Sequence, residues 1–193
     1  MKSDIVLAGV GGQGILTIAT ILGAAALNEN LYLKQAEVHG MSQRGGDVQS
    51  NLRLSSRPIH SDLIPLGGAD LIVSLEPMEA LRYLPFLSKE GWIVTNSLPF
   101  VNIDNYPDMT AVEEELARCP RVISFDMEAL AKEVASARSS NLVLLGAASP
   151  FIDIAPEKIE EAVCALFIPK GEKIVESNIA AFRAGRERAL SMK

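Results

Sequence analysis

Short apolar blocks alternate with longer stretches of helical spacing over the first two thirds of the chain. The apolar blocks have the length of buried strands, and the longer stretches place apolar residues along one face of a helix. Predicted strands span residues 4–9, 31–36, 48–54, 69–75, 91–96 and 121–126. Predicted helices span residues 12–28, 110–118 and 127–137, and a further one opens at Glu76 with Pro77 in the favoured first helical position.

The last third of the chain contains helical stretches alone, at residues 141–148, 156–167 and 174–189. Strands that alternate with helices are typical of a parallel sheet covered on both faces. The pattern therefore predicts an α/β fold: a Rossmann-like open, mostly parallel sheet with helices on both faces and a helical carboxy-terminal region. We expect a single domain over residues 1–193.

Three local features refine this expectation. The first strand, helix and second strand should form a βαβ unit with a right-handed crossover. The stretch 48–54 alternates between polar and apolar residues, as an edge or half-exposed strand does. Residues 99–107, rich in Pro, Asn and Asp, predict a long surface loop.

Composition narrows the class of protein. With 193 residues, 48% hydrophobic and 22% charged, the chain is long and apolar enough to bury a core, which excludes intrinsic disorder. The net charge of −6 argues against general nucleic-acid binding. No apolar run approaches the ~20 residues of a membrane span, and no signal-peptide pattern begins the chain, so we expect a cytoplasmic protein. Cys119 and Cys164 lack the spacing of a zinc or iron–sulfur site.

The first candidate for chemistry is Gly9-Val10-Gly11-Gly12-Gln13-Gly14, a G-x-G-x-x-G run between a predicted strand and helix. Backbone N–H groups at such a turn bind anions. Glu37 lies 37 − 14 = 23 residues after the last glycine, near where a dinucleotide fold places its ribose-binding acid. No lysine follows Gly14, which excludes a P-loop. Alternatively, the glycines serve only a tight turn and close packing.

The second candidate is the run E-V-H-G-M-S-Q-R-G-G at residues 37–46, at the predicted carboxyl end of a strand, where open α/β sheets bind ligands. His39 is a candidate general acid or base, or an anion contact, although no carboxylate partner is evident. The guanidinium of Arg44 suits a phosphate or carboxylate. A surface salt bridge is the alternative role for Arg44.

Together with V-Q-S-N-L-R at residues 48–53, these two glycine-rich motifs resemble the gamma-type domain of 2-oxoacid:ferredoxin oxidoreductases. The resemblance spans nearly the whole chain. In its length and in having no attached domain, the chain is similar to the free-standing subunits of the indolepyruvate branch. It implies oxidative decarboxylation of an aryl pyruvate such as indolepyruvate to the arylacetyl-CoA, with reduction of ferredoxin. Related gamma subunits serve pyruvate and 2-oxoglutarate enzymes, so the substrate stays open.

The resemblance also implies a division of labour. A larger alpha subunit is expected to bring thiamine diphosphate, Mg²⁺ and [4Fe–4S] clusters, and the complex receives coenzyme A and ferredoxin. This chain alone would bind no cofactor and no metal, and would not be active. It would line the active-site cleft, with His39 its one catalytic candidate. The expected ligand-binding or anion-binding residues are Gly11, Gly12, Gln13, Gly14, Ser42, Gln43, Arg44, Gly45 and Gly46.

Two other functions remain compatible with these residues. A stand-alone NAD- or FAD-binding protein would use the glycine run for the pyrophosphate and Glu37 for the ribose. A non-catalytic scaffold would use residues 39–46 only to order a partner subunit. Dinucleotide titration distinguishes the first, and kinetics of an intact complex distinguish the second.

Overall fold

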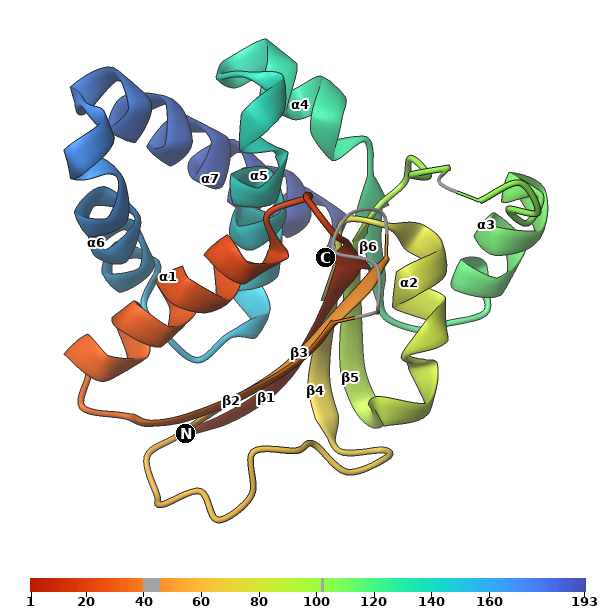
Figure 1. Cartoon of the computed structure of the whole chain (residues 1–193), viewed down its shortest axis with the longest axis horizontal. Coiled ribbons are helices and arrows are strands. Elements are labelled where there is room, and N and C mark those ends of the chain that lie inside the picture. Colours follow the sequence, from red (N-terminus) through yellow and green to blue (C-terminus); the bar gives the residue numbers. More distant parts are fainter. Residues whose placement is uncertain (40–45, 102) are drawn as a thin grey trace.

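A six-stranded sheet lies between two layers of helices (Figure 1). The structure, a computed structural model, describes residues 1–39, 46–101 and 103–193. Its strands are β1 (Lys2–Val10), β2 (Tyr32–His39), β3 (Asp47–Ser55), β4 (Ala69–Ser74), β5 (Leu87–Asn96) and β6 (Val122–Phe125). Its α-helices are α1 (Ile15–Asn28), α2 (Pro77–Arg82), α3 (Met109–Ala117), α4 (Met127–Val134), α5 (Ser140–Ala148), α6 (Pro156–Phe167) and α7 (Glu172–Met192).

The strand order in the sheet is β2-β3-β1-β4-β5-β6. β1, β4, β5 and β6 pair in parallel, whereas β3 runs antiparallel to both of its neighbours. The predicted α/β fold, with its mostly parallel sheet and helical carboxy-terminal region, is therefore confirmed. No helix in the described part of the chain has the length and apolar character needed to cross a membrane.

The position of β3 corrects one expectation. The stretch 48–54 was expected at an edge or half exposed, but β3 is an interior strand, paired with β2 on one side and β1 on the other. Leu52 and Leu54 are buried in the core shared with α1, whereas Asn51 and Arg53 meet the connection that follows the strand. The alternation thus reflects the two faces of β3, one covered by the apolar core and the other by the polar connection, and does not indicate an open edge.

β3 also changes the predicted βαβ unit. β1 and β2 run in the same direction and are joined through α1, yet β3 separates them. The segment between β2 and β3, residues 40–46, is far too short for a crossover helix, so the chain must return antiparallel. The returning strand occupies the place beside β1 that a simple crossover would have left to β2.

Each face of the sheet has its own hydrophobic core. Along β1, Ile5 and Leu7 belong to the core beneath α1, α4, α5, α6 and α7, while Val6 and Ala8 belong to the core beneath α2 and α3. Figure 1 shows these two groups of helices on opposite sides of the sheet. A strand apolar on both faces is the mark of a sheet covered on both sides, as the sequence pattern predicted.

α5 is the centre of the larger helix layer, and residues 141–148 are all buried. It packs backbone to backbone against α7 at two glycines. A Cβ added at Gly146 would lie 1.9 Å from the carbonyl oxygen of Phe182, and one added at Gly185 would lie 2.0 Å from that of Val143. Only glycine permits this approach, and it brings the start of α7 beside the start of α5.

This contact predicts that Gly185→Ala separates the two helices and lowers the free energy of unfolding by about 3 kcal/mol, at the upper end of overpacking costs. Urea unfolding followed by circular dichroism measures the loss. Glu187→Ala, an exposed change on the same helix, is the control and should stay within about 0.5 kcal/mol of the parent. Equal stability of the two variants would contradict the close approach.

Candidate functional site

The first glycine motif forms the turn between β1 and α1. Gly12 has a φ of 103° and Gly14 a φ of 81°, values that residues other than glycine rarely adopt. The helix consequently begins at Ile15, not at residue 12 as the pattern predicted. Gly14 is also crowded, because an added Cβ would lie 2.8 Å from Nδ2 of Asn141. The turn therefore needs glycine for its backbone conformation and, at Gly14, for space.

The side chain of Gln13 supports this turn from within. Its Oε1 accepts a hydrogen bond from the Val10 N–H at 2.8 Å, and its Nε2 donates to the carbonyl oxygen of Leu75 at 3.3 Å. Leu75 directly follows β4, so Gln13 ties the turn to the neighbouring parallel strand. Both polar side-chain atoms of Gln13 thus hold the turn. The sequence had predicted a ligand-binding role for Gln13 and gave no indication of this structural one.

The turn still offers backbone donors. The N–H groups of Gly12 and Gly14 have no acceptor among the described residues, and no side chain caps the start of α1. An uncapped helix start with orphan N–H groups favours an anion. A cavity of about 320 Å³ lies beside these groups, and the side chains of Val10, Leu16 and Val48 line it. The arrangement suits a ligand that has an anionic group at one end and an apolar group next to it.

The second motif ends beside this turn. Gly46 accepts a hydrogen bond from the Gly11 N–H at 2.9 Å, so the two glycine motifs meet at one end of the sheet. His39 ends β2 and pairs with Val48. The expected ligand residues Ser42, Gln43, Arg44 and Gly45 and the side chain of His39 lie outside the described residues. Their roles stay predictions.

The dinucleotide alternative loses its main support. That fold needs its acidic residue on the strand next to the glycine turn. Glu37 instead lies on β2, two strands from β1, about 10 Å away at the usual strand spacing. Its carboxylate accepts a hydrogen bond from Gln35 Nε2 at 2.5 Å.

Buried polar residues follow β4 at the same end of the sheet, and sequence reasoning missed their role. Glu76 is 1% exposed, accepts from the Glu79 N–H at 2.7 Å and also from the hydroxyl of Tyr106. Burial, together with that hydrogen bond, raises the pKa of Tyr106. Burial likewise raises the pKa of Glu79, although its ion pair with Arg82 at 2.8 Å opposes this. The Glu-Pro pair predicted the helix start, but nothing in the pattern indicated Tyr106 as its partner.

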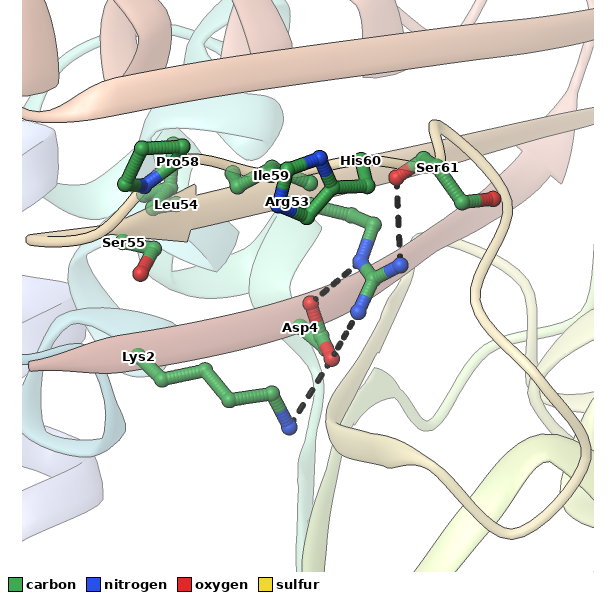
Figure 2. A pocket seen from close by; sticks show the side chains of 9 residues that line it. All are labelled: Lys2, Asp4, Arg53, Leu54, Ser55, Pro58, Ile59, His60 and Ser61. Carbon is green, nitrogen blue, oxygen red and sulfur yellow. Dashed lines mark hydrogen bonds and ion pairs between the residues drawn. The ribbon is translucent and has the colours of Figure 1, made fainter.

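A pocket of about 360 Å³ lies at the opposite end of β1 (Figure 2). At its centre, Arg53 forms a two-bonded ion pair with Asp4, at 2.7 and 3.0 Å. The same guanidinium donates to the carbonyl oxygens of Ser61 and Leu63 at 3.1 and 3.0 Å. These bonds fasten the connection between β3 and β4 to the sheet, so Arg53 has a structural role. His60 lines this pocket and is exposed.

No group of three or more His, Cys, Asp or Glu side chains in the described ranges is placed to hold a metal ion. Cys119 and Cys164 are both free thiols. They lie on opposite sides of the sheet, Cys119 beside the core of α3 and Cys164 within α6. The described residues therefore do not fit an iron–sulfur cluster, which needs several thiolates together.

Comparison with known sequences gives a consistent family. The model of the pyruvate ferredoxin/flavodoxin oxidoreductase family matches residues 4–188. The chain is 35% identical to indolepyruvate oxidoreductase subunit IorB of Archaeoglobus fulgidus, over 99% of this chain and 97% of that protein. It is 38% identical to IorB of Thermococcus kodakarensis, over 98% and 96%. Identity to 2-oxoglutarate synthase subunit KorC of Methanocaldococcus jannaschii is 31%, over 97% and 94%.

Solved structures show the same fold. The gamma subunit of a keto/oxoacid ferredoxin oxidoreductase from Geobacter sulfurreducens superposes with a TM-score of 0.70 at 24% identity, over 98% of this chain and 99% of that one. The 2-oxoglutarate:ferredoxin oxidoreductase of Magnetococcus marinus, with 2-oxoglutarate, coenzyme A and succinyl-CoA bound, gives a TM-score of 0.78 at 24% identity. The match covers all of this chain but only 32% of that chain.

The ion pair at the far end of the sheet predicts an acid-dependent loss of stability. Burial by itself would raise the pKa of Asp4, but the hydrogen bonds from Arg53 and Lys2 outweigh it and hold that pKa below its usual value. A carboxyl with a lowered folded pKa stabilises the fold above its unfolded pKa, and this contribution disappears as pH falls through the folded value. Urea unfolding of Asp4→Asn should lack that part of the dependence below about pH 4.

Arg53→Gln is the companion change, because it leaves the buried Asp4 carboxylate with Lys2 as its remaining cation. It should cost about 3 kcal/mol at pH 7. Asp62→Asn, at an exposed carboxylate of the same connection, is the control. If Asp4→Asn lost stability at low pH just as the parent does, the ion pair would contribute nothing to the free energy of unfolding.

Proposed function

The chain belongs to the pyruvate ferredoxin/flavodoxin oxidoreductase family, and on that premise we propose that it is the small subunit of a heteromeric 2-oxoacid:ferredoxin oxidoreductase. The full-length match to the IorB subunits carries this proposal. The Magnetococcus chain supports it from another side, since there the same fold is part of a chain about three times as long. Because the IorB relatives, which this chain matches over 96–97% of their length, are named as subunits, we expect this chain to work with a separate, larger subunit.

Indolepyruvate, or a similar aryl pyruvate, is the proposed substrate. The chain is 33–38% identical to four IorB subunits, compared with 27–31% for three 2-oxoglutarate synthase subunits of similar coverage. The reaction would convert the 2-oxoacid to an acyl-CoA with release of carbon dioxide and transfer of two electrons to ferredoxin. 2-Oxoglutarate and pyruvate are the alternative substrates.

The cofactors of this reaction are proposed to reside on the larger subunit. Thiamine diphosphate with Mg²⁺ would supply the carbanion chemistry and [4Fe–4S] clusters the electron transfer. The two separated thiols and the lack of a metal-binding group among the described residues support this division. Free thiols also agree with a reducing compartment, and we propose that the subunit acts in the cytoplasm. The fold over residues 1–193 would act as one domain.

The glycine turn is proposed as this chain's contribution to ligand binding. The N–H groups of Gly12 and Gly14 would face a phosphate of coenzyme A or the carboxylate of the oxoacid, with the apolar cavity beside them. Arg44, only two residues before Gly46, would add a guanidinium on the same side. Because Gly46 bonds to Gly11, the connecting segment ends at the turn that it is proposed to complete.

Arg44→Ala tests this role in the assembled enzyme. Removing a cation that contacts an anionic ligand should raise the KM for coenzyme A or for the oxoacid by about tenfold, the value of one charge-assisted hydrogen bond. Steady-state kinetics under anaerobic conditions measure both constants. Arg57→Ala, at an exposed cation near the opposite end of β3, is the matched control and should leave both unchanged.

Two results would contradict this role of Arg44. Unchanged KM values for both ligands would exclude it from binding. A weaker subunit association without any kinetic change in the remaining complex would instead support the scaffold role of residues 39–46.

Anaerobic purification of the tagged chain from its native cells tests the subunit proposal itself. We expect a larger protein to co-elute and the complex to be brown, because iron–sulfur clusters absorb broadly in the visible range. Thiamine analysis of the eluate should locate the cofactor with the larger protein. A colourless chain that elutes alone would contradict the proposal.

A further inference from the structure

A second polar pocket lies within the larger helix layer and belongs to none of the sites described above. Its volume is about 340 Å³, and it is bounded by the first turn of α1, the start of α5 and the junction of α6 with α7. Leu142, Phe167 and Ile174 form its apolar walls, and most of its other residues carry hydroxyl or amide groups. No acidic side chain is among the described residues that line it.

Two cations stand at the rim of this pocket. Arg138 comes from the short 3₁₀ turn before α5 (Ala137–Ser139), and Lys170 from the one after α6 (Ile168–Lys170). Neither forms an ion pair or a side-chain hydrogen bond with any described residue. The Lys170 Nζ lies 4.9 Å from the centre of the Phe167 ring, at the pocket wall. The fold thus brings two exposed cations from separate turns to one pocket.

The floor of the pocket contains an amide with an unused donor. Asn178 is 6% exposed, and its Oδ1 accepts from the Ser139 hydroxyl at 3.1 Å. Its Nδ2 has no acceptor among the described residues. Every fully enclosed side-chain nitrogen or oxygen in those residues has a partner, so this Nδ2 is not fully enclosed, and Asn178 is one of the residues that line the pocket. A nearly buried N–H group without an acceptor favours a ligand that supplies one.

The start of α5 adds to the positive electrostatic potential of the pocket. Its first turn has no side-chain cap, and Asn141 of that turn lines the pocket. The helix dipole at this end favours negative charge. Two cations, a buried amide donor and a helix start therefore converge on one space, and the described lining offers no counter-charge.

We propose that this pocket binds the phosphate group of a small molecule. Two cations beside an amide donor suit a phosphate, which carries more negative charge than a carboxylate and presents three outer oxygens as acceptors. The pocket volume lies in the lower range of small-molecule sites, and its apolar walls leave room for a short organic group. Inorganic phosphate and a phosphomonoester share this chemistry.

The phosphate pocket is separate from the glycine turn, although the two are close. They share no lining residue. Asn141 lies between them, because its Nδ2 donates to the carbonyl oxygen of Gly14 at 3.4 Å while the residue also lines the pocket. The inference does not depend on the proposed enzyme function, but its test must distinguish the two anion sites.

Titration of the ¹⁵N-labelled full-length chain with inorganic phosphate, at constant ionic strength, makes that distinction. We expect a saturable chemical-shift change at the side-chain NH₂ of Asn178. Arg138→Gln and Lys170→Gln should each weaken binding by about tenfold, as expected for loss of one charged contact, and the double variant should abolish it. Arg57→Gln, at an exposed cation far from the pocket, should bind as the parent does.

Phenyl phosphate in a parallel titration identifies the source of the phosphate. Tighter binding than inorganic phosphate would support an organic phosphate held against Phe167 and Ile174, and equal or weaker binding would support the inorganic ion. Three results would overturn the proposal: a shift that does not saturate, a shift confined to the Gly12 amide of the glycine turn, or unchanged affinity in the double variant.

Discussion

Nine residues of β3 pair antiparallel with β1, in a register that ends with Asp47 opposite Val10. This pairing brings the carbonyl oxygen of Gly46 to the N–H of Gly11, and with it the second glycine motif to the first. The candidate site at the glycine turn depends on that register, because a shift of one residue would turn every side chain of β3 to the opposite face. The same strand pushes β2 outward and carries Glu37 away from the turn, which separates this fold from a dinucleotide-binding one.

The two ends of β1 illustrate two uses of polar groups. At its start, the Asp4 carboxylate and the Arg53 guanidinium satisfy each other and hold the connection between β3 and β4. At its end, the N–H groups of Gly12 and Gly14 have no acceptor among the described residues. A saturated buried ion pair contributes to structure, whereas unsatisfied donors at a helix start contribute to binding. Size alone would favour the start of β1, since the slightly larger of the two pockets lies there.

The proposed phosphate pocket depends on the close contact of α5 with α7. Gly146 and Gly185 allow the two backbones to touch, which brings Asn178 of α7 beneath Ser139 at the start of α5. Arg138 and Lys170 both line this pocket, although they come from separate turns. Neither the cations nor the amide form a sequence motif, so the pocket is a property of helix packing.

The sequence by itself determined the secondary structure, the layers and the glycine turn. The apolar blocks predicted β1 and β4 because strands buried on both faces leave a continuous apolar signature, as Ile5 to Ala8 show, whereas alternation of polar and apolar residues predicted β3. The glycines at 12 and 14 predicted the turn because their positive φ values exclude other residues. Tertiary structure alone decided the strand order, the role of Gln13, the Tyr106–Glu76 contact and the pocket beneath Arg138. These depend on contacts between residues far apart in the chain, and a local pattern of polarity holds no information on which distant partner a polar group meets.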